Sequence, residues 1–135
     1  MASHGQPPLL PPTPQQIETL ALEALSRLPA PFSEHLAHVV LFVEEFADED
    51  VLKDMEIDDP FGLTGLYTGR PVGQEAQTGD APPTVHLYRR PLLDEWVETG
   101  VPLDALITHV VVHEIGHHFG LSDIDMNVLE DMVAP

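Results

Sequence analysis

Apolar residues recur at three- and four-residue spacing through residues 17–28, which is the period of a helix that buries one face. Thr13 is a good N-cap, Pro14 suits the first helical position, and Gln16 stands where a capping box places a glutamine. Pro29 closes the segment because proline cannot continue a helix. The pattern predicts a first helix whose apolar side faces the core.

Three short segments have the composition of β-strands. Residues 39–43 are a continuous run of β-branched and aromatic side chains, which predicts a central strand covered on both faces. Residues 64–68 predict a second strand, and the alternation of apolar and polar side chains in residues 84–90 predicts a third, half-buried one. Residues 32–37 suggest a helical turn, and the acidic segment 44–59 a short helix with a solvated face.

The pattern in the last third of the chain predicts helices. Residues 92–97 predict a short helix ended by Gly100. A long helix then opens at Pro102 and is apolar on most sides, which indicates burial. A last helix over residues 122–132 has Ser122 as its cap. Its expected packing residues are Val128, Leu129 and Met132.

The length of 135 residues suits one domain and is too short for two. We expect this domain over residues 13–135, after a flexible Pro-rich tail over residues 1–12. The tail lacks the basic start and apolar core of a secretion signal, so we expect a cytoplasmic protein. Residues 69–83 predict a long polar loop, either a flap over substrate or an exposed tip.

The net charge and the absence of cysteine exclude several classes of binding partner and of metal site. The net charge of −18 opposes binding to nucleic acid or to an anionic membrane. The chain has no cysteine, which excludes disulfides and thiolate metal sites. Histidine, aspartate and glutamate are the strong metal ligands that remain.

His113, Glu114 and His117 form an HExxH motif within the long predicted helix. Four residues advance a helix by about 6 Å, so both imidazoles project from one face and can close on a single ion. Glu114 follows the first ligand and can take a proton from an attacking water. Ionisable groups on a buried helix are costly, and metal coordination compensates that cost.

A third ligand must come from beyond the helix. Gly120 tolerates the left-handed conformation that ends a helix. Asp123 follows three residues later and can return toward the ion with a carboxylate oxygen. If Asp123 is not the ligand, Asp125 or Glu130 is the next candidate.

Two further histidines flank the motif. His109 lies one turn before His113, but about 12 Å along the axis from His117, too far for both to bind one tetrahedral ion. His109 is therefore expected to support the site from outside the ligand shell. His118 lies about 100° round the helix from His117 and is expected to face elsewhere.

The extended pattern HExxHxxGxxD is specific. From the composition of the chain, HExxH is expected by chance about 0.04 times and the extended pattern about 2 × 10⁻⁴ times. The alternative is a buried helix whose histidines form hydrogen bonds in the core. In that case Ser122, Asp123 and Asp125 only cap the following helix.

This pattern, in a small acidic chain without cysteine and after a TVHLYRRPLL segment, resembles the minimal zincin-type metallopeptidase family of bacteria. The resemblance extends over residues 14–132. It implies a single α+β domain with a small mixed sheet packed by helices, one of which carries the motif. It also implies that the strand at residues 84–88 lies at the sheet edge beside that helix, where a peptide aligns.

The same resemblance implies a zinc-dependent hydrolase that cleaves peptide bonds in peptides or proteins. One zinc ion is then held by His113, His117 and Asp123, and Glu114 is the general base. A hydrogen-bond donor to the developing oxyanion is also expected. The candidates are His86 and Tyr88, taken as substrate-binding residues, and Tyr67.

Two other functions stay open from the sequence. One is a noncatalytic binding module that keeps zinc for stability, since so small a chain has little room for substrate selection. The other is a metal-dependent endoribonuclease, because a bacterial family of that kind has ligands at HxxxHxxxxxH spacing. The charge of −18 and the Glu in the motif oppose this second alternative.

Overall fold

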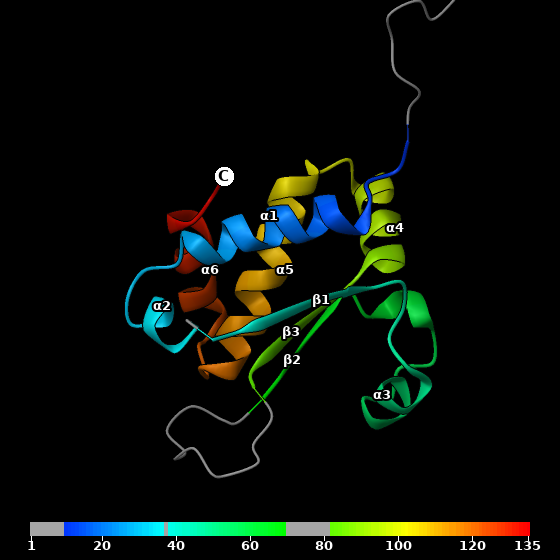
Figure 1. Cartoon of the computed structure of the whole chain (residues 1–135), viewed down its shortest axis with the longest axis horizontal. Coiled ribbons are helices and arrows are strands. Elements are labelled where there is room, and N and C mark those ends of the chain that lie inside the picture. Colours follow the sequence, from blue (N-terminus) through cyan, green and yellow to red (C-terminus); the bar gives the residue numbers. More distant parts are fainter. Residues whose placement is uncertain (1–9, 37, 70–81) are drawn as a thin grey trace, which may run out of the picture.

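The computed structural model describes residues 10–36, 38–69 and 82–135 (Figure 1). In chain order the elements are α1 (Pro14–Ser26), α2 (Phe32–His35), β1 (Val40–Glu44), α3 (Glu49–Asp54), the 3-10 helix η1 (Pro60–Gly62), β2 (Gly65–Thr68), β3 (Thr84–Tyr88), α4 (Arg89–Thr99), α5 (Leu103–His118) and α6 (Asp123–Met132). Most of the predicted tail and of the predicted loop, residues 1–9 and 70–81, lies outside this description. None of the helices in the described ranges is both long and apolar enough to cross a membrane.

The three strands form a mixed sheet in the order β1-β3-β2. β1 pairs with β3 in parallel, and β2 pairs with β3 in antiparallel. His86 at the middle of β3 stands opposite Phe42 on one side and Leu66 on the other. The predicted α+β class with a small mixed sheet is confirmed.

The predicted position of the first strand is wrong, because β1 is an edge strand and not the central one. Its continuous apolar run divides between two environments. Leu41 and Val43 pack against the main core, whereas Phe42 points to the other face, stacks on His86 and stays 52% exposed. Phe42 is thus an apolar side chain that is stabilised by His86 on the next strand and not by burial. The continuous apolar run therefore does not indicate a strand that is buried on both faces.

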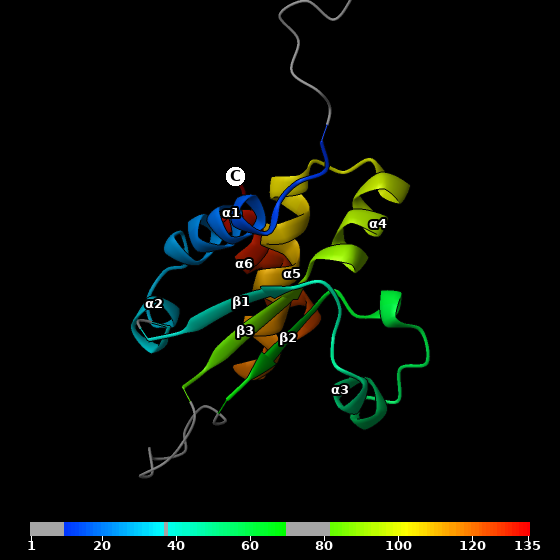
Figure 2. The same cartoon turned by 45° about the vertical axis from the view of Figure 1, so that its right-hand side comes forward.

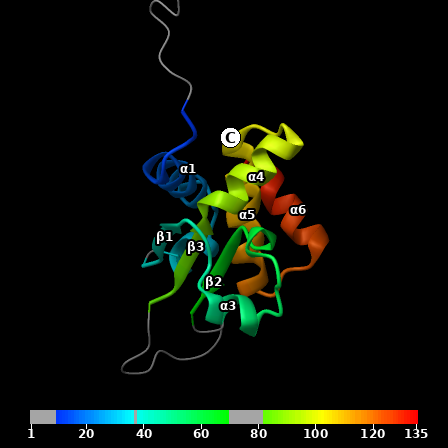
Figure 3. The ribbon, with the colours of Figure 1, turned by 90° about the vertical axis from the view of Figure 1, so that its right-hand side faces the viewer.

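The main core lies between one face of the sheet and the helices α1 and α5 (Figure 2). Val85 and Leu87 of β3 are fully buried in this core. α1 contributes the stripe predicted from the sequence, with Ile17, Ala21 and Ala24 fully buried. α5 lies between β2 and α6, so it is covered from both sides (Figure 3).

β3 is the central strand, which corrects its predicted place at the sheet edge. The edge strand beside α5 is β2 instead. β3 is also more buried than predicted, because a second cluster formed with Ala47, Leu52 and Leu63 covers Tyr88 on the face away from the main core. Tyr88 is only 2% exposed as a result.

The helix ends follow the predicted capping chemistry. Thr13 and Gln16 exchange the two hydrogen bonds of a capping box, and the Ser122 hydroxyl accepts from the Asp125 N–H at 3.2 Å. Gly100 and Gly120 both have left-handed backbone conformations after their helices, with φ of 71° and 72°. These observations confirm the predicted starts of α1 and α6 and the predicted ends of α4 and α5.

Two details of the helices differ from the predictions. α4 begins at Arg89, before its predicted start, because Pro91 falls in the first turn, where a missing N–H costs no helical hydrogen bond. α6 buries Met126 and Leu129, whereas Val128 and Met132 are exposed. The side chain of Met126 takes the place in the core that was expected for Met132.

Gly116 is the residue that lets α6 approach α5 closely. A Cβ atom at this position would lie 2.6 Å from Cγ and 2.7 Å from Sδ of the buried Met126. We expect Gly116→Val to lower the free energy of unfolding by about 1–3 kcal/mol, measured by urea denaturation, because the packed interface cannot take the added volume. Met126→Ala in the same chain should recover part of that loss, and additive effects of the two substitutions would contradict this account.

Candidate metal centre

α5 combines a buried body with a row of histidines at four-residue spacing. Its buried side chains include Ile107, Val111 and Ile115, which face the sheet and α1. His109, His113 and His117 follow one another along the opposite side, which leads toward α6 and solvent. Of the neighbouring rings, His109 and His113 lie 4.1 Å apart between centroids, and His113 and His117 lie 6.4 Å apart.

His113 has an unsatisfied ring nitrogen. Its Nε2 atom is buried and makes no hydrogen bond, although Glu130 Oε1 of α6 lies 3.3 Å away. Burial, with the adjacent His109 as a smaller cause, lowers the pKa of His113 below its ordinary value. A neutral imidazole with a buried, unpartnered nitrogen is the form that binds a metal ion, and without an ion it carries a desolvation cost.

Glu114 is held between α5 and β2. Its Oε2 atom accepts a hydrogen bond from the Tyr67 backbone N–H at 3.2 Å. β2 comes this close because Gly65 has no side chain, and a Cβ atom there would lie 2.7 Å from Val110 Cγ1. Burial raises the pKa of Glu114, and the charge of His117 and the Tyr67 hydrogen bond oppose that rise.

The raised pKa of Glu114 predicts a dependence of stability on pH in the metal-free chain. A carboxyl whose pKa is higher in the folded state stabilises the fold below its unfolded pKa, and this contribution is lost as pH rises through the folded pKa. We therefore expect Glu114→Gln to unfold at higher urea concentration than the wild type at neutral pH, in the presence of a chelator. The difference should vanish below about pH 4, where glutamate is protonated in both states. An equal difference at both pH values would contradict it.

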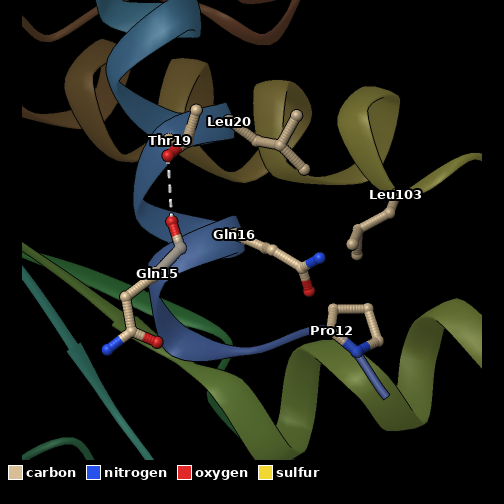
Figure 4. A pocket seen from close by; sticks show the side chains of 6 residues that line it. All are labelled: Pro12, Gln15, Gln16, Thr19, Leu20 and Leu103. Atoms are coloured by element: carbon tan, nitrogen blue, oxygen red, sulfur yellow. Dashed lines mark hydrogen bonds between the residues drawn. The ribbon is translucent and has the colours of Figure 1, made fainter. Parts of the chain in front are cut away.

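A small polar pocket opens beside these groups. Its volume is about 130 Å³, and it is lined by Thr64, Glu95, His109, Val110, His113 and Glu114. Thr64 and Glu95 were not singled out from the sequence, and no local pattern there points to a site. A larger pocket of about 460 Å³ lies at the start of α1 and α5, around Pro12, Gln16 and Leu103 (Figure 4). No titratable side chain lines it, so the smaller pocket is the candidate for chemistry.

The structure brings His109, His113 and Glu130 together. Their possible ligand atoms all lie within 4.8 Å of one another. His109 Nδ1 lies 2.6 Å from Glu130 Oε1, which also approaches His113. The sequence predicts His109 outside the ligand shell and offers Glu130 only as a substitute for Asp123. The spacing within α5 identified the helix face, but no sequence signal showed which residue of α6 faces it.

The other two predicted ligands are His117 and Asp123, and both are exposed. Within residues 10–36, 38–69 and 82–135, neither His117 nor Asp123 belongs to the group of close ligand atoms. His117 is exposed in the last turn of α5. Asp123 is exposed in the first turn of α6, just after its cap Ser122, where a carboxylate favours the positive end of the helix dipole. Their ligand roles stay predictions.

The predicted substrate residues lie on two faces of the sheet. His86 and Tyr88 alternate with the core residues of β3, so they project from the face opposite α5. His86 Nδ1 bonds Glu44 Oε1 at 2.9 Å, and burial together with Glu44 raises the pKa of Tyr88 to about 12. Tyr67 lies on the face toward α5, where its ring stacks on His118 at 4.0 Å between centroids. Of the three, Tyr67 is the one beside Glu114.

Comparison with known protein families finds a match for most of the chain. A sequence profile described as Zincin-like metallopeptidase matches residues 36–133, which include every strand and all of α5 and α6. A search of curated proteins finds no match to this chain. The matched region contains the HExxH motif, the small mixed sheet and the pocket at His113 and Glu114. The chain therefore belongs to the zincin-like metallopeptidase family.

Proposed function

We propose that the protein is a zinc-dependent metallopeptidase that cleaves peptide bonds in peptides or proteins. The observation that supports this most is a pair of groups on α5 that line one pocket, the buried and unpartnered His113 Nε2 atom and the partly buried carboxylate of Glu114. Membership of the zincin-like metallopeptidase family supports the same activity.

The side chains at the site fit a zinc ion. Imidazole nitrogen and carboxylate oxygen are ordinary zinc ligands, and a neutral His113 needs no deprotonation before it binds. We assign His113, His117 and Asp123 as the three ligands, as the extended motif predicts. Zinc, when bound, supplies a Lewis acid that polarises the substrate carbonyl and makes a water molecule more acidic.

Glu114 is the proposed general base. Its carboxylate accepts a proton from the attacking water at one oxygen, while the Tyr67 N–H holds the other. The same carboxyl then gives this proton to the leaving amine. Burial raises its pKa above the ordinary value of a glutamate, which favours uptake of a proton by this group.

Tyr67 is the proposed donor to the developing oxyanion, because it comes from the strand that faces α5 beside Glu114. His86 and Tyr88, on the opposite face of the sheet, are not assigned to this step. β2 rather than β3 is the edge strand beside the motif helix. An extended peptide would therefore align with β2.

A peptide library with mass-spectrometric detection tests the proposal. The wild-type chain loaded with one equivalent of zinc should cleave a subset of peptides, lose this activity with a chelator and regain it when zinc is returned. Absence of cleavage by the zinc-loaded, folded chain contradicts the proposal. It would favour the second candidate, a noncatalytic module that zinc stabilises. The small volume of the pocket, about 130 Å³, supports that candidate.

A further inference from the structure

The contact between α5 and α6 holds a second set of metal-ligand atoms. His109 and His113 stand one turn apart on α5, and Glu130 reaches both from α6. His109 Nδ1 lies 2.6 Å and His113 Nε2 lies 3.3 Å from the same oxygen, Glu130 Oε1. Two imidazoles thus approach one carboxylate oxygen from the facing helix, and the possible ligand atoms of all three residues lie within 4.8 Å of one another.

One of the distances between ligand atoms already suits a tetrahedral transition-metal ion. Ligands about 2.0–2.1 Å from such an ion lie about 3.4 Å from one another. The separation of 3.3 Å between His113 and Glu130 already has this value. The closer contact of His109 to Glu130 is that of a hydrogen bond, which an ion replaces when it displaces the shared proton. His109 and Glu130 are both partly exposed, so their side chains have room for this adjustment.

The surroundings also favour a cation. His109 and His113 line the small pocket together with the carboxylates Glu95 and Glu114. His113 Nε2 has no hydrogen-bond partner that a metal would have to displace. A ligand set of two imidazole nitrogens and one carboxylate oxygen fits zinc or cobalt better than calcium or magnesium, which prefer all-oxygen ligand sets.

We propose that His109, His113 and Glu130 form a second position for one transition-metal ion, distinct from the His113–His117–Asp123 set. Binding at this position does not depend on peptidase activity. The two positions share His113, and its Nε2 atom can ligate only one ion at a time. Mutual exclusion of the two positions rests on the proposed function, which assigns His113 to the motif ligands.

Cobalt(II) titration of the metal-free, full-length chain tests this, because tetrahedral cobalt has intense visible absorption. In His117→Ala/Asp123→Ala, which keeps only the second position, we expect one cobalt per chain. Adding His109→Ala or Glu130→Gln to this variant should raise the cobalt Kd at least tenfold. Asp131→Asn, next to Glu130 on the exposed side of α6, is the matched control and should leave the Kd unchanged. Circular dichroism checks that each variant is folded.

The outcomes separate this inference from the proposed function. If wild type binds one cobalt and His117→Ala/Asp123→Ala binds none, the second position does not exist and the motif ligands stand. If His109→Ala or Glu130→Gln in the wild-type background removes the cobalt while His117→Ala/Asp123→Ala keeps it, the second position is supported. In that case the assigned ligand set is overturned. A folded wild-type chain that binds no cobalt overturns both.

Discussion

Replacing Glu114 with glutamine is expected to lower kcat/KM for peptide hydrolysis by about 10²–10⁴-fold and to leave the zinc content unchanged. Glutamine has the same shape and can still accept the hydrogen bond from the Tyr67 N–H, but it cannot take a proton from water. The measurement is kcat/KM on a peptide selected from the library, beside zinc per chain by mass spectrometry. The effect is large because no other carboxylate is assigned to this proton transfer.

The matched control is Glu98→Gln, the same chemical change on the exposed side of α4 and outside the pocket. It should retain wild-type kcat/KM. Hydrolysis by Glu114→Gln at the wild-type rate would remove Glu114 from the mechanism. A joint loss of zinc and activity would instead give Glu114 a part in binding the ion.

Replacing His113 with alanine should weaken zinc binding more than any other single substitution in the chain. His113 is the member common to the motif ligands and to the group with His109 and Glu130. Whichever set holds the ion, it loses an imidazole. Because loss of a supporting residue costs about 10–100-fold in metal affinity, loss of a ligand should cost more than about 100-fold. Competition with a chromogenic chelator measures this Kd.

His118→Ala is the control for His113→Ala, since it removes the same ring from the same helix. His118 stacks on Tyr67 and lies outside the group of close ligand atoms. It should bind zinc with nearly wild-type affinity. Equal weakening by the two variants would mean that damage to α5, and not loss of a ligand, explains the effect.

Local signals in the sequence predicted the elements well. A capping box starts α1, Ser122 starts α6, and a left-handed glycine follows α4 and α5. Each of these features depends on neighbours a few residues away, so the sequence alone displays it. The helical spacing of His113 and His117 is local in the same sense.

The errors concern contacts between distant segments. The apolar run in β1 indicated burial but not which neighbour supplies it, and Phe42 turned out to stack on His86 from another strand. Likewise, the distance along α5 predicts that His109 and His117 are too far apart to share an ion, yet it could not show that Glu130 reaches His109 from α6. Sheet order and helix pairing are set by the packing of the whole core, which periodicity within one element does not contain.

The order of the strands has a consequence for how the chain folds during synthesis. Within the part of the chain that the structure describes, β1 and β2 each pair only with β3, which comes last of the three in the chain. On the ribosome, both earlier strands therefore wait without their partner until Tyr88 has emerged. Sheet formation is then a late step that closes a parallel and an antiparallel ladder around one strand, while the contacts within α1 can form early. Before that point β1 and β2 are unpaired, and this is the stage of synthesis at which protection by a chaperone matters most.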